Sequence, residues 1–418
     1  MQPQSAFVNL VEVEKTSSAG ARASLFALCF GNFIIGTGTL IVPGMLPQLA
    51  DGLGVSLPVA GQLVTAFAAA VCVGAPLLAG VTSRFDRRDL LVAMQLVFVA
   101  GHLGAALLSS YWPLLAVRVL TSVGAAVYTA QAASAAALLV PPAERGRAIA
   151  FVFLGWAIAS VAGVPVGSYV AAVWGWREGF ALVAAGAALG AAGVWLFVPR
   201  GLRVAAVDAA MWRSIVRDPA MMASVGVTAL FAGAGFALFA YFVPAARSFL
   251  GASPEVVAML LGTFGIAGVT GSMLAARYMD RVGPGNVVML CLASMLAAHL
   301  LWPWSQGSVA LVALVMAGAG VGVFAGNSAQ QARVAAIAPA AAPVSIALNS
   351  SAIYLGQALG PAAGGILIAH VPGSTGYALI AAISVPLLVT AIGLSRFASL
   401  RMRAQARSAH VQGRAATR

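Results

Sequence analysis

Residues 375–394 read TGYALIAAISVPLLVTAIGL, a run of 20 positions without a charged side chain. About 20 consecutive apolar residues are needed for a helix to cross the hydrocarbon core of a bilayer. A second uncharged run, LLVAMQLVFVAGHLGAALLS, covers residues 90–109. Both runs are far longer than the ~10-residue strands of an outer-membrane barrel. They therefore predict helices that span a membrane.

The composition extends this interpretation to the whole chain. Of the 418 residues, 61% are hydrophobic and 8% are charged, whereas about 25% are charged in an ordinary soluble domain. These values exclude a soluble enzyme, a disordered tail and a disulfide scaffold. Windows of high hydropathy between polar breaks predict twelve helices, near residues 24–46, 57–82, 90–110, 112–140, 148–174, 179–198, 220–246, 256–276, 286–304, 308–332, 343–370 and 374–395.

The formal net charge of +12 does not indicate a nucleic-acid partner, because the basic residues lie in the predicted loops. Cys29, Cys72 and Cys291 lie inside apolar runs, without CxxC spacing or a nearby pair of histidines. We therefore expect no metal, no cofactor and no disulfide. The first 22 residues lack the apolar segment of a cleavable signal, so the first span is expected to insert uncleaved.

The basic residues also predict the orientation. Numbered alternately, the spans place 20 of the 23 lysines and arginines on one side, leave Arg177 and Arg247 on the other, and enclose Arg118. By the positive-inside rule both termini are cytoplasmic. The expected segments are a cytoplasmic N-terminal segment (1–22), a first six-helix bundle (23–198), a cytoplasmic central loop (199–219), a second bundle (220–396) and a basic tail (397–418). We expect the tail to lie on the anionic inner leaflet, although a regulatory partner is an alternative.

The two predicted bundles are related by a constant shift. Adding 197 to a position in the first half repeatedly reaches the same residue type in the second. The matches are Gly36 and Gly233, Pro47 and Pro244, Phe67 and Phe264, Gly74 and Gly271, Arg84 and Arg281, His102 and His299, Pro142 and Pro339, Gly163 and Gly360, and Gly167 and Gly364. Two parallel six-helix repeats place a substrate path between the halves, near the bilayer midplane.

Several motifs resemble the major facilitator superfamily, and within it the bacterial drug:proton antiporter and sugar-efflux (arabinose efflux permease-like) branch. The resemblance covers nearly the whole chain. The similar segments are GNFIIGTGTLIVPGMLPQLADGLGVS (31–56), AGQLVTAF (60–67), LAVRVL (115–120), GVPVG (163–167), GWREGF (175–180) and GQALGPAAGG (356–365). It implies an all-α membrane protein of twelve helices in two parallel repeats. It also implies a gating role for the antiporter-motif residues Gly163, Pro165, Gly167, Gly360, Pro361 and Gly364.

The chain departs from the family pattern at acidic positions. The loop that usually reads GxxxDRxGRR is AGVTSRFDRR (79–88) here, with Ser83 in place of the aspartate. Thr39 stands where many relatives carry a glutamate in the first span. In the family this loop latches the halves together, so the resemblance implies a cytoplasmic latch of Arg84, Asp86, Arg88, Asp280 and Arg281. The arginines could equally be topological anchors.

Arg118 is the one basic residue inside a predicted span, and no acidic residue accompanies it. It lies about 9 Å below Trp112, against roughly 15 Å for half of the hydrocarbon core. Its head group could snorkel to the interface, but a charge at depth usually faces a water-filled cavity. We favour the cavity. The histidine pair His102 and His299 is interpreted as structural.

Polar side chains on central helices should point away from lipid. Together with Arg118 they predict a substrate cavity of neutral or weakly positive character, lined by Asn32, Thr39, Gln62, Arg118, Tyr128, Tyr241, Asn327, Asn349, Tyr354 and Gln357. Phe236, Phe239, Phe264 and Phe324 could add apolar walls.

The leading hypothesis is a secondary active transporter that exports a small organic molecule by proton antiport with alternating access, acting as a monomer in the bacterial inner membrane. The proton could be carried by Asp51, Asp280, the histidine pair or the substrate. The alternative is an uncoupled facilitator of the same fold, which the missing membrane acids favour. A membrane enzyme or a receptor is disfavoured because the spans lack clustered titratable groups.

Overall fold

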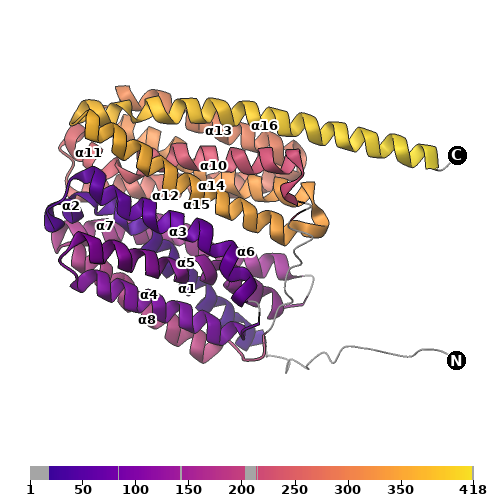
Figure 1. The fold of residues 1–418 in the computed structure, drawn as a ribbon, viewed down its shortest axis with the longest axis horizontal. Helices are drawn as coiled ribbons and strands as arrows, with labels where there is room; N and C mark the ends of the chain where they lie inside the picture. Colours follow the sequence, from indigo (N-terminus) through magenta and orange to yellow (C-terminus); the bar gives the residue numbers. More distant parts are fainter. Residues whose placement is uncertain (1–17, 83, 142–143, 203–212, 214, 417–418) are drawn as a thin grey trace.

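The computed structural model describes residues 18–416 apart from 83, 142–143, 203–212 and 214. Every regular element in this part of the chain is helical, as expected (Figure 1). In chain order the elements are α1 (Ser18–Gly44), α2 (Leu46–Leu53), α3 (Leu57–Thr82), α4 (Arg87–Leu107), α5 (Tyr111–Leu138), α6 (Arg145–Ile158), the π-helical turn η2 (Ala159–Gly163), α7 (Val164–Val173), α8 (Trp176–Phe197), α10 (Pro219–Ala240), α11 (Phe242–Leu250), α12 (Pro254–Val282), α13 (Pro284–Leu301), the 3₁₀ turn η3 (Trp302–Trp304), α14 (Val309–Ile337), the 3₁₀ turn η4 (Pro339–Ala341), α15 (Ala342–His370) and α16 (Ser374–Ala416).

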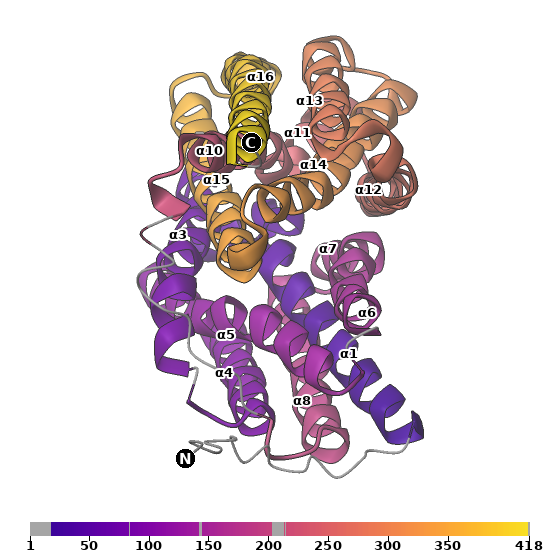
Figure 2. The ribbon, with the colours of Figure 1, turned by 90° about the vertical axis from the view of Figure 1, so that its right-hand side faces the viewer.

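Twelve helices within the described residues are long and apolar enough to cross a membrane, and they match the twelve predicted spans in order. The fifth span, Arg145–Val173, consists of α6, η2 and α7. The helices form two bundles that lie side by side, the first coloured indigo to magenta and the second pink to yellow (Figures 1 and 2). The predicted fold class is therefore confirmed.

Corresponding helices of the two bundles begin at the same distance in sequence that separates the matching residues. Three pairs of helices begin 197 residues apart, at Leu57 and Pro254, at Arg87 and Pro284, and at Arg145 and Ala342. His102 and His299 have the same role in the two bundles. Their Nδ1 atoms lie 2.9 and 2.8 Å from the carbonyl oxygens of Phe98 and Met295, one turn earlier. Both rings are buried, which agrees with the structural interpretation of the pair.

Two predicted spans extend past the ends of the corresponding helices. The windows 24–46 and 220–246 ran through helix breaks at Met45 and Tyr241, where the backbone leaves the helical region and the short helices α2 and α11 begin. Each short helix ends at a left-handed glycine, Gly54 (φ 63°) or Gly251 (φ 57°), which has no Cβ to strain that conformation. The sequence stays apolar through these breaks, so hydropathy windows do not detect them. We call this end of the molecule the α2/α11 end.

Pro165 accounts for the irregular fifth span. A proline has no N–H to donate into the helix, and the π-helical turn η2 lies immediately before it. The fifth span therefore contains a π-helical turn between α6 and α7. In the eleventh span Pro361 lies inside a continuous α15.

The two bundles contact each other unevenly. Helix α3 packs against α15, and α12 packs against η2 and α7 but far less against α6. Because α7 leads toward the α2/α11 end and α6 toward the opposite end, the fifth span and α12 separate toward the opposite end. At the α2/α11 end itself, α2 contacts α11, and α1 contacts α10 and α11.

The described parts of the predicted central loop are each held by one bundle. The backbone N–H of Arg87 donates to the carbonyl oxygen of Leu202 (3.0 Å), while Ile215 packs among buried residues of the second bundle. The predicted N-terminal segment lies almost entirely outside the described residues. The predicted basic tail continues α16 as a helix to Ala416 and projects past the bundle in Figure 1.

Candidate functional site

A buried polar cluster, which we call the first-half cluster, joins α1, α5 and α6. The Asn32 amide donates to the carbonyl oxygen of Val152 (3.0 Å) and accepts from the Thr129 hydroxyl (2.8 Å). The Trp156 indole N–H in turn donates to the Thr129 hydroxyl oxygen (3.2 Å). Asn32 is fully buried, whereas Thr129 and Trp156 are half-buried. The cluster contains no ionisable group.

A second cluster, the second-half cluster, joins α10, α14 and α15. The Thr228 hydroxyl donates to the Asn349 amide oxygen (2.6 Å) and accepts from the Gln330 amide (3.1 Å). The Gln330 amide also donates to the Ser224 carbonyl oxygen (2.6 Å), and the Asn349 amide donates to the Asn327 side-chain oxygen (3.3 Å). Asn327 is the half-buried member, and again no member is ionisable.

An aromatic cluster lies beside α10 in the second half. The rings of Phe239 and Phe264 are 4.9 Å apart, and Phe264 lies 5.7 Å from Phe324. Phe236 extends the row from Phe239 at 5.9 Å. These separations are typical of favourable aromatic pairs. The structure therefore brings together the four phenylalanines expected to form an apolar wall.

Arg118 lies inside the first bundle, with 1% of its surface exposed. Its guanidinium lies 4.3 Å from the ring centre of Phe67 and 5.9 Å from that of Phe180, and it donates to the carbonyl oxygen of Gly38 (3.3 Å). Its Nε and Nη2 atoms have no partner among the described residues. Aromatic faces and a backbone carbonyl thus surround the charge, and no described carboxylate contacts it.

Tyr241 lies where the two halves meet. Its hydroxyl donates to the carbonyl oxygen of Pro361 (3.0 Å), which ties the break after α10 to α15. A methyl group placed on Gly61 of α3 would collide with this hydroxyl, and one on Gly364 would lie 3.0 Å from the ring. Tyr241 therefore packs against helices of both halves.

The other predicted cavity residues lie in varied surroundings. Thr39 is buried, and its hydroxyl donates to the carbonyl oxygen of Ile35 (2.7 Å) in its own helix. Tyr128 and Gln357 are buried, Tyr354 is half-buried and Gln62 is exposed. The structure thus places Asn32, Asn327 and Asn349 in the two polar clusters. Thr39, Gln62, Tyr128, Tyr354 and Gln357 lie outside these clusters.

The antiporter-motif glycines are sites of close helix approach. A methyl group on Gly163 would collide with Thr37 of α1, and one on Gly167 would lie 2.7 Å from Ile41. In the second half, a methyl on Gly360 would meet the backbone of Gly233 and Ala237 in α10. Small residues allow the fifth and eleventh spans to pack closely against the first and seventh.

The predicted latch residues make their contacts within one half. Asp86 caps α4 by accepting from the N–H of Arg88 (2.9 Å), and its second oxygen accepts from the N–H of Gly201 (2.6 Å). The guanidinium of Arg88 lies 4.3 Å from the ring centre of Trp195, and that of Arg84 lies 5.8 Å from that of its neighbour Phe85.

The remaining latch residues lie in the second half. Arg281 is exposed and has no partner among the described residues, and the side chain of Asp280 lies outside them.

A polar contact between the halves occurs at the α2/α11 end. With the Gln48 amide oriented to satisfy both of its groups, its nitrogen donates to the carbonyl oxygen of Met45 (3.3 Å) and its oxygen accepts from Arg247 (2.7 Å). Burial lowers the pKa of Arg247, and the nearby carboxylate of Asp51 opposes that effect. Among the described residues, this is the one hydrogen bond that joins the two halves.

Sequence reasoning missed Thr129, Trp156, Ser224 and Thr228 as cluster members. Serine and threonine hydroxyls in membrane helices commonly bond to the carbonyl one turn earlier, as Thr39 does, so residue type alone does not identify an interhelical partner. Trp156 carried a usable signal. It is the one tryptophan in the middle of the fifth predicted span, and a buried indole N–H requires an acceptor.

Comparison with known proteins gives consistent matches over most of the chain. The family model described as Major Facilitator Superfamily matches residues 28–327 and 225–412. The inner membrane transport protein YdhP of Escherichia coli O157:H7 is 31% identical over 347 residues, 82% of this chain and 88% of that protein. A chloramphenicol resistance protein of Streptomyces lividans is 31% identical over 360 residues, 84% of this chain and 91% of that protein.

A solved structure has the same fold. The bacterial homologue of the human lysosomal transporter Spinster, in an inward-facing and occupied conformation, superposes with a TM-score of 0.75 at 18% identity. The match covers 92% of this chain and 98% of that chain.

Proposed function

Since this chain belongs to the Major Facilitator Superfamily, a family of transporters and not of enzymes, we propose that it exports an uncharged, amphiphilic small molecule. The observation that carries this proposal is the chemistry of the two polar clusters. Each cluster offers amide, hydroxyl or indole groups and no ionisable side chain. Each also has half-buried residues, which are Thr129 and Trp156 in the first half and Asn327 in the second.

The buried members of the clusters have a supporting role in this proposal. Asn32 and Asn349 hold the accessible groups in place through hydrogen bonds, and the phenylalanine row beside α10 supplies an apolar wall. Ligand sites commonly combine an apolar wall with a few placed polar groups. A cationic substrate would have no carboxylate to neutralise it in these clusters, so we exclude strongly cationic compounds from the proposal.

The relatives suggest where to look for a substrate and a membrane. One relative is named a chloramphenicol resistance protein and another an inner membrane transport protein. Chloramphenicol combines an aromatic ring with amide and hydroxyl groups and carries no ionised group, so it is the first compound to test. We place the chain in the bacterial inner membrane, with the α2/α11 end outside, because the order of the spans in the sequence assigns 20 of the 23 basic residues to the opposite side.

The proposed mechanism is alternating access. At the α2/α11 end Arg247 bonds to Gln48 and α2 contacts α11, while α12 and the fifth span separate toward the cytoplasm. We assign this arrangement to an inward-facing state. Parting of α2 from α11, with closure on the cytoplasmic side, would complete the cycle.

Proton antiport is the proposed driving reaction. One charge that crosses about 100 mV supplies roughly 2.3 kcal/mol, enough for a gradient of about 40-fold. An uncoupled facilitator is the second candidate, and the absence of acidic residues from the middle of the spans favours it. In both cases we propose a monomer.

Transport in inverted membrane vesicles tests these proposals. We expect energised vesicles that contain the protein to accumulate radiolabelled chloramphenicol or a comparable neutral amphiphile, and a proton ionophore to abolish the accumulation. Equilibration at a rate independent of the ionophore would instead establish the facilitator. Flux of organic cations, with none of the neutral compounds, would overturn the substrate class.

A further inference from the structure

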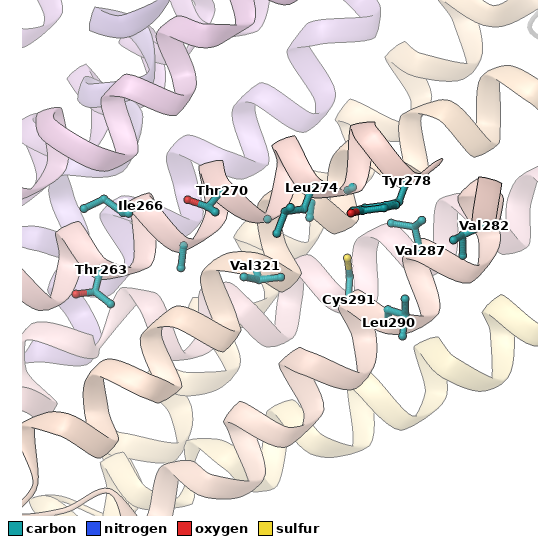
Figure 3. A pocket seen from close by; sticks show the side chains of 14 residues that line it. Thr263, Ile266, Thr270, Leu274, Tyr278, Val282, Val287, Leu290, Cys291 and Val321 are labelled. Carbon is teal, nitrogen blue, oxygen red and sulfur yellow. The ribbon is translucent and has the colours of Figure 1, made fainter. Parts of the chain in front are cut away.

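An apolar groove runs along the outside of the second bundle, away from both polar clusters. It has a volume of about 570 Å³, within the range of ligand sites, and lies between α12 and α13 with Val321 of α14 also in its lining (Figure 3). Helices α12 and α13 barely touch each other, although both pack against α14. We call this feature the α12–α13 groove.

The rim of the α12–α13 groove faces outward. Ile266 is 57% exposed, Leu274 is 53% exposed and Leu290 of α13 is 65% exposed. Helices α12 and α13 are membrane spans, so these side chains face the lipid phase. Thr263, Thr270 and Tyr278 carry the hydroxyl groups of the lining, and Thr263 donates its own to the Met259 carbonyl oxygen (2.9 Å); the other lining residues are apolar. The groove therefore presents a hydrocarbon surface to hydrocarbon chains.

Two arginines lie on the same face of α12 at the end of the groove that Tyr278 and Val282 line. Arg277 follows Thr270 by seven residues and Arg281 follows Leu274 by seven, which is two helical turns in each case. Both arginines are exposed, and neither has a carboxylate partner among the described residues. Two cations that can bind phosphate thus lie at the end of an acyl-chain-sized groove.

We propose that the α12–α13 groove binds one anionic phospholipid, with an acyl chain in the groove and the headgroup phosphate on Arg277 and Arg281. Lipid tails are as apolar as the groove, so burial alone gives little preference for one lipid over another. The headgroup must supply the selectivity. An attraction of about 1 kcal/mol per arginine corresponds to roughly five-fold per charge, or about 25-fold for the pair. The proposal is independent of the transported substrate and of the direction of transport.

Native mass spectrometry of the full-length protein tests this directly. Protein reconstituted in vesicles of equal parts phosphatidylglycerol and phosphatidylethanolamine is extracted, and the lipid retained after detergent washing is measured. We expect one tightly held phosphatidylglycerol. The double variant Arg277→Gln/Arg281→Gln should lose the preference about 25-fold and still retain lipid of either kind. If the native protein retained the two phospholipids in the same proportions as the vesicle, the proposal would be overturned.

A groove-filling variant separates the site from general lipid contact. Thr270→Phe places a ring in the α12–α13 groove and should abolish retention of any lipid there. Val73→Phe is the matched control, because Val73 is the repeat-related position on α3, is 61% exposed and does not line the groove. If Thr270→Phe retained phosphatidylglycerol like the control, the groove would not be the site. If it slowed substrate flux with lipid retention unchanged, the groove would belong to a substrate path instead.

Discussion

Thr129 is the residue on which the first-half cluster depends, because it accepts from Trp156 and donates to Asn32. Thr129→Val keeps the side-chain shape and removes both bonds. We expect kcat/KM for export to fall about five-fold, as the loss of about 1 kcal/mol implies, while Thr129→Ser restores most of it. Initial rates in inverted vesicles measure the effect.

Thr263→Val is the control for this variant, since the Thr263 hydroxyl bonds only within its own helix. Equal losses at the two positions would mean that Thr129 acts through general helix stability and not through the cluster.

Arg118 gives a second prediction at this scale. Its planar guanidinium lies 4.3 Å from the Phe67 ring and bonds to the Gly38 carbonyl oxygen, a combination that a lysine ammonium does not reproduce. A desolvated cation–π contact contributes about 2 kcal/mol, so we expect Arg118→Lys to reduce transport about 30-fold. Arg401→Lys is the control, because Arg401 lies over Phe397 at an exposed position. Transport by Arg118→Lys at the native rate would contradict a role for the planar group.

At the residue scale, the sequence predicted polar positions better than it predicted their partners. Asparagine is costly in lipid, so Asn32, Asn327 and Asn349 were expected to point inward, and each lies in a cluster. Arg118 was expected beside a cavity, and its guanidinium contacts the Gly38 carbonyl oxygen and the rings of Phe67 and Phe180. Which helix a side chain meets depends on packing between distant segments, and a single sequence does not contain that information.

At the scale of elements, the crossing of α12 over the fifth span brings backbone atoms of the two halves close together. A methyl on Gly265 would lie 2.5 Å from the carbonyl oxygen of Ser160 and 2.7 Å from the nitrogen of Val161. Backbone atoms cannot rotate away, so Gly265→Ala must separate α12 from η2, at a cost of about 1–3 kcal/mol. We expect the inward-facing state to be depleted about five-fold or more, and export to slow.

Gly393→Ala controls for the added methyl group, because it meets nothing within 4 Å. Thiol labelling of Thr129→Cys from the cytoplasmic side, with Cys29, Cys72 and Cys291 replaced, measures the population of the inward-facing state. Labelling of Gly265→Ala at the rate of the Gly393→Ala control would remove this crossing from the mechanism.

The twelve spans were predictable because each is a long apolar run, and the repeat was predictable because matching residues recur at a constant distance. The helix breaks were not, although the repeat contained a signal for them. Pro47 and Pro244, like Gly54 and Gly251, are 197 residues apart. Each proline lies in the first turn of a short helix, α2 or α11, and each glycine follows its last residue. Hydropathy averages over such breaks. A proline and a left-handed glycine that recur at the repeat distance identify them.

At the scale of the whole molecule, the bond between Arg247 and Gln48 holds the two bundles together at the α2/α11 end. We expect Arg247→Gln to weaken this closure and to shift the population toward the state open at that end. A hydrogen bond from a half-buried charged group, reduced for solvent screening, contributes about 1 kcal/mol, which corresponds to a shift of about five-fold. The shift is read as faster labelling of Thr129→Cys by a membrane-impermeant maleimide from the outside.

Arg177→Gln is the matched control for this prediction. Arg177 is the other arginine of the outer side, but its contacts, with the Leu108 carbonyl oxygen (3.4 Å) and the Trp176 ring (4.2 Å), stay within the first bundle. Loss of this arginine removes the same charge without releasing one half from the other, so outside labelling should be unchanged. If both variants accelerated labelling equally, surface charge and not a bond between the halves would set the equilibrium. If neither did, the closure would depend on the apolar packing of α2, α11 and α1 alone.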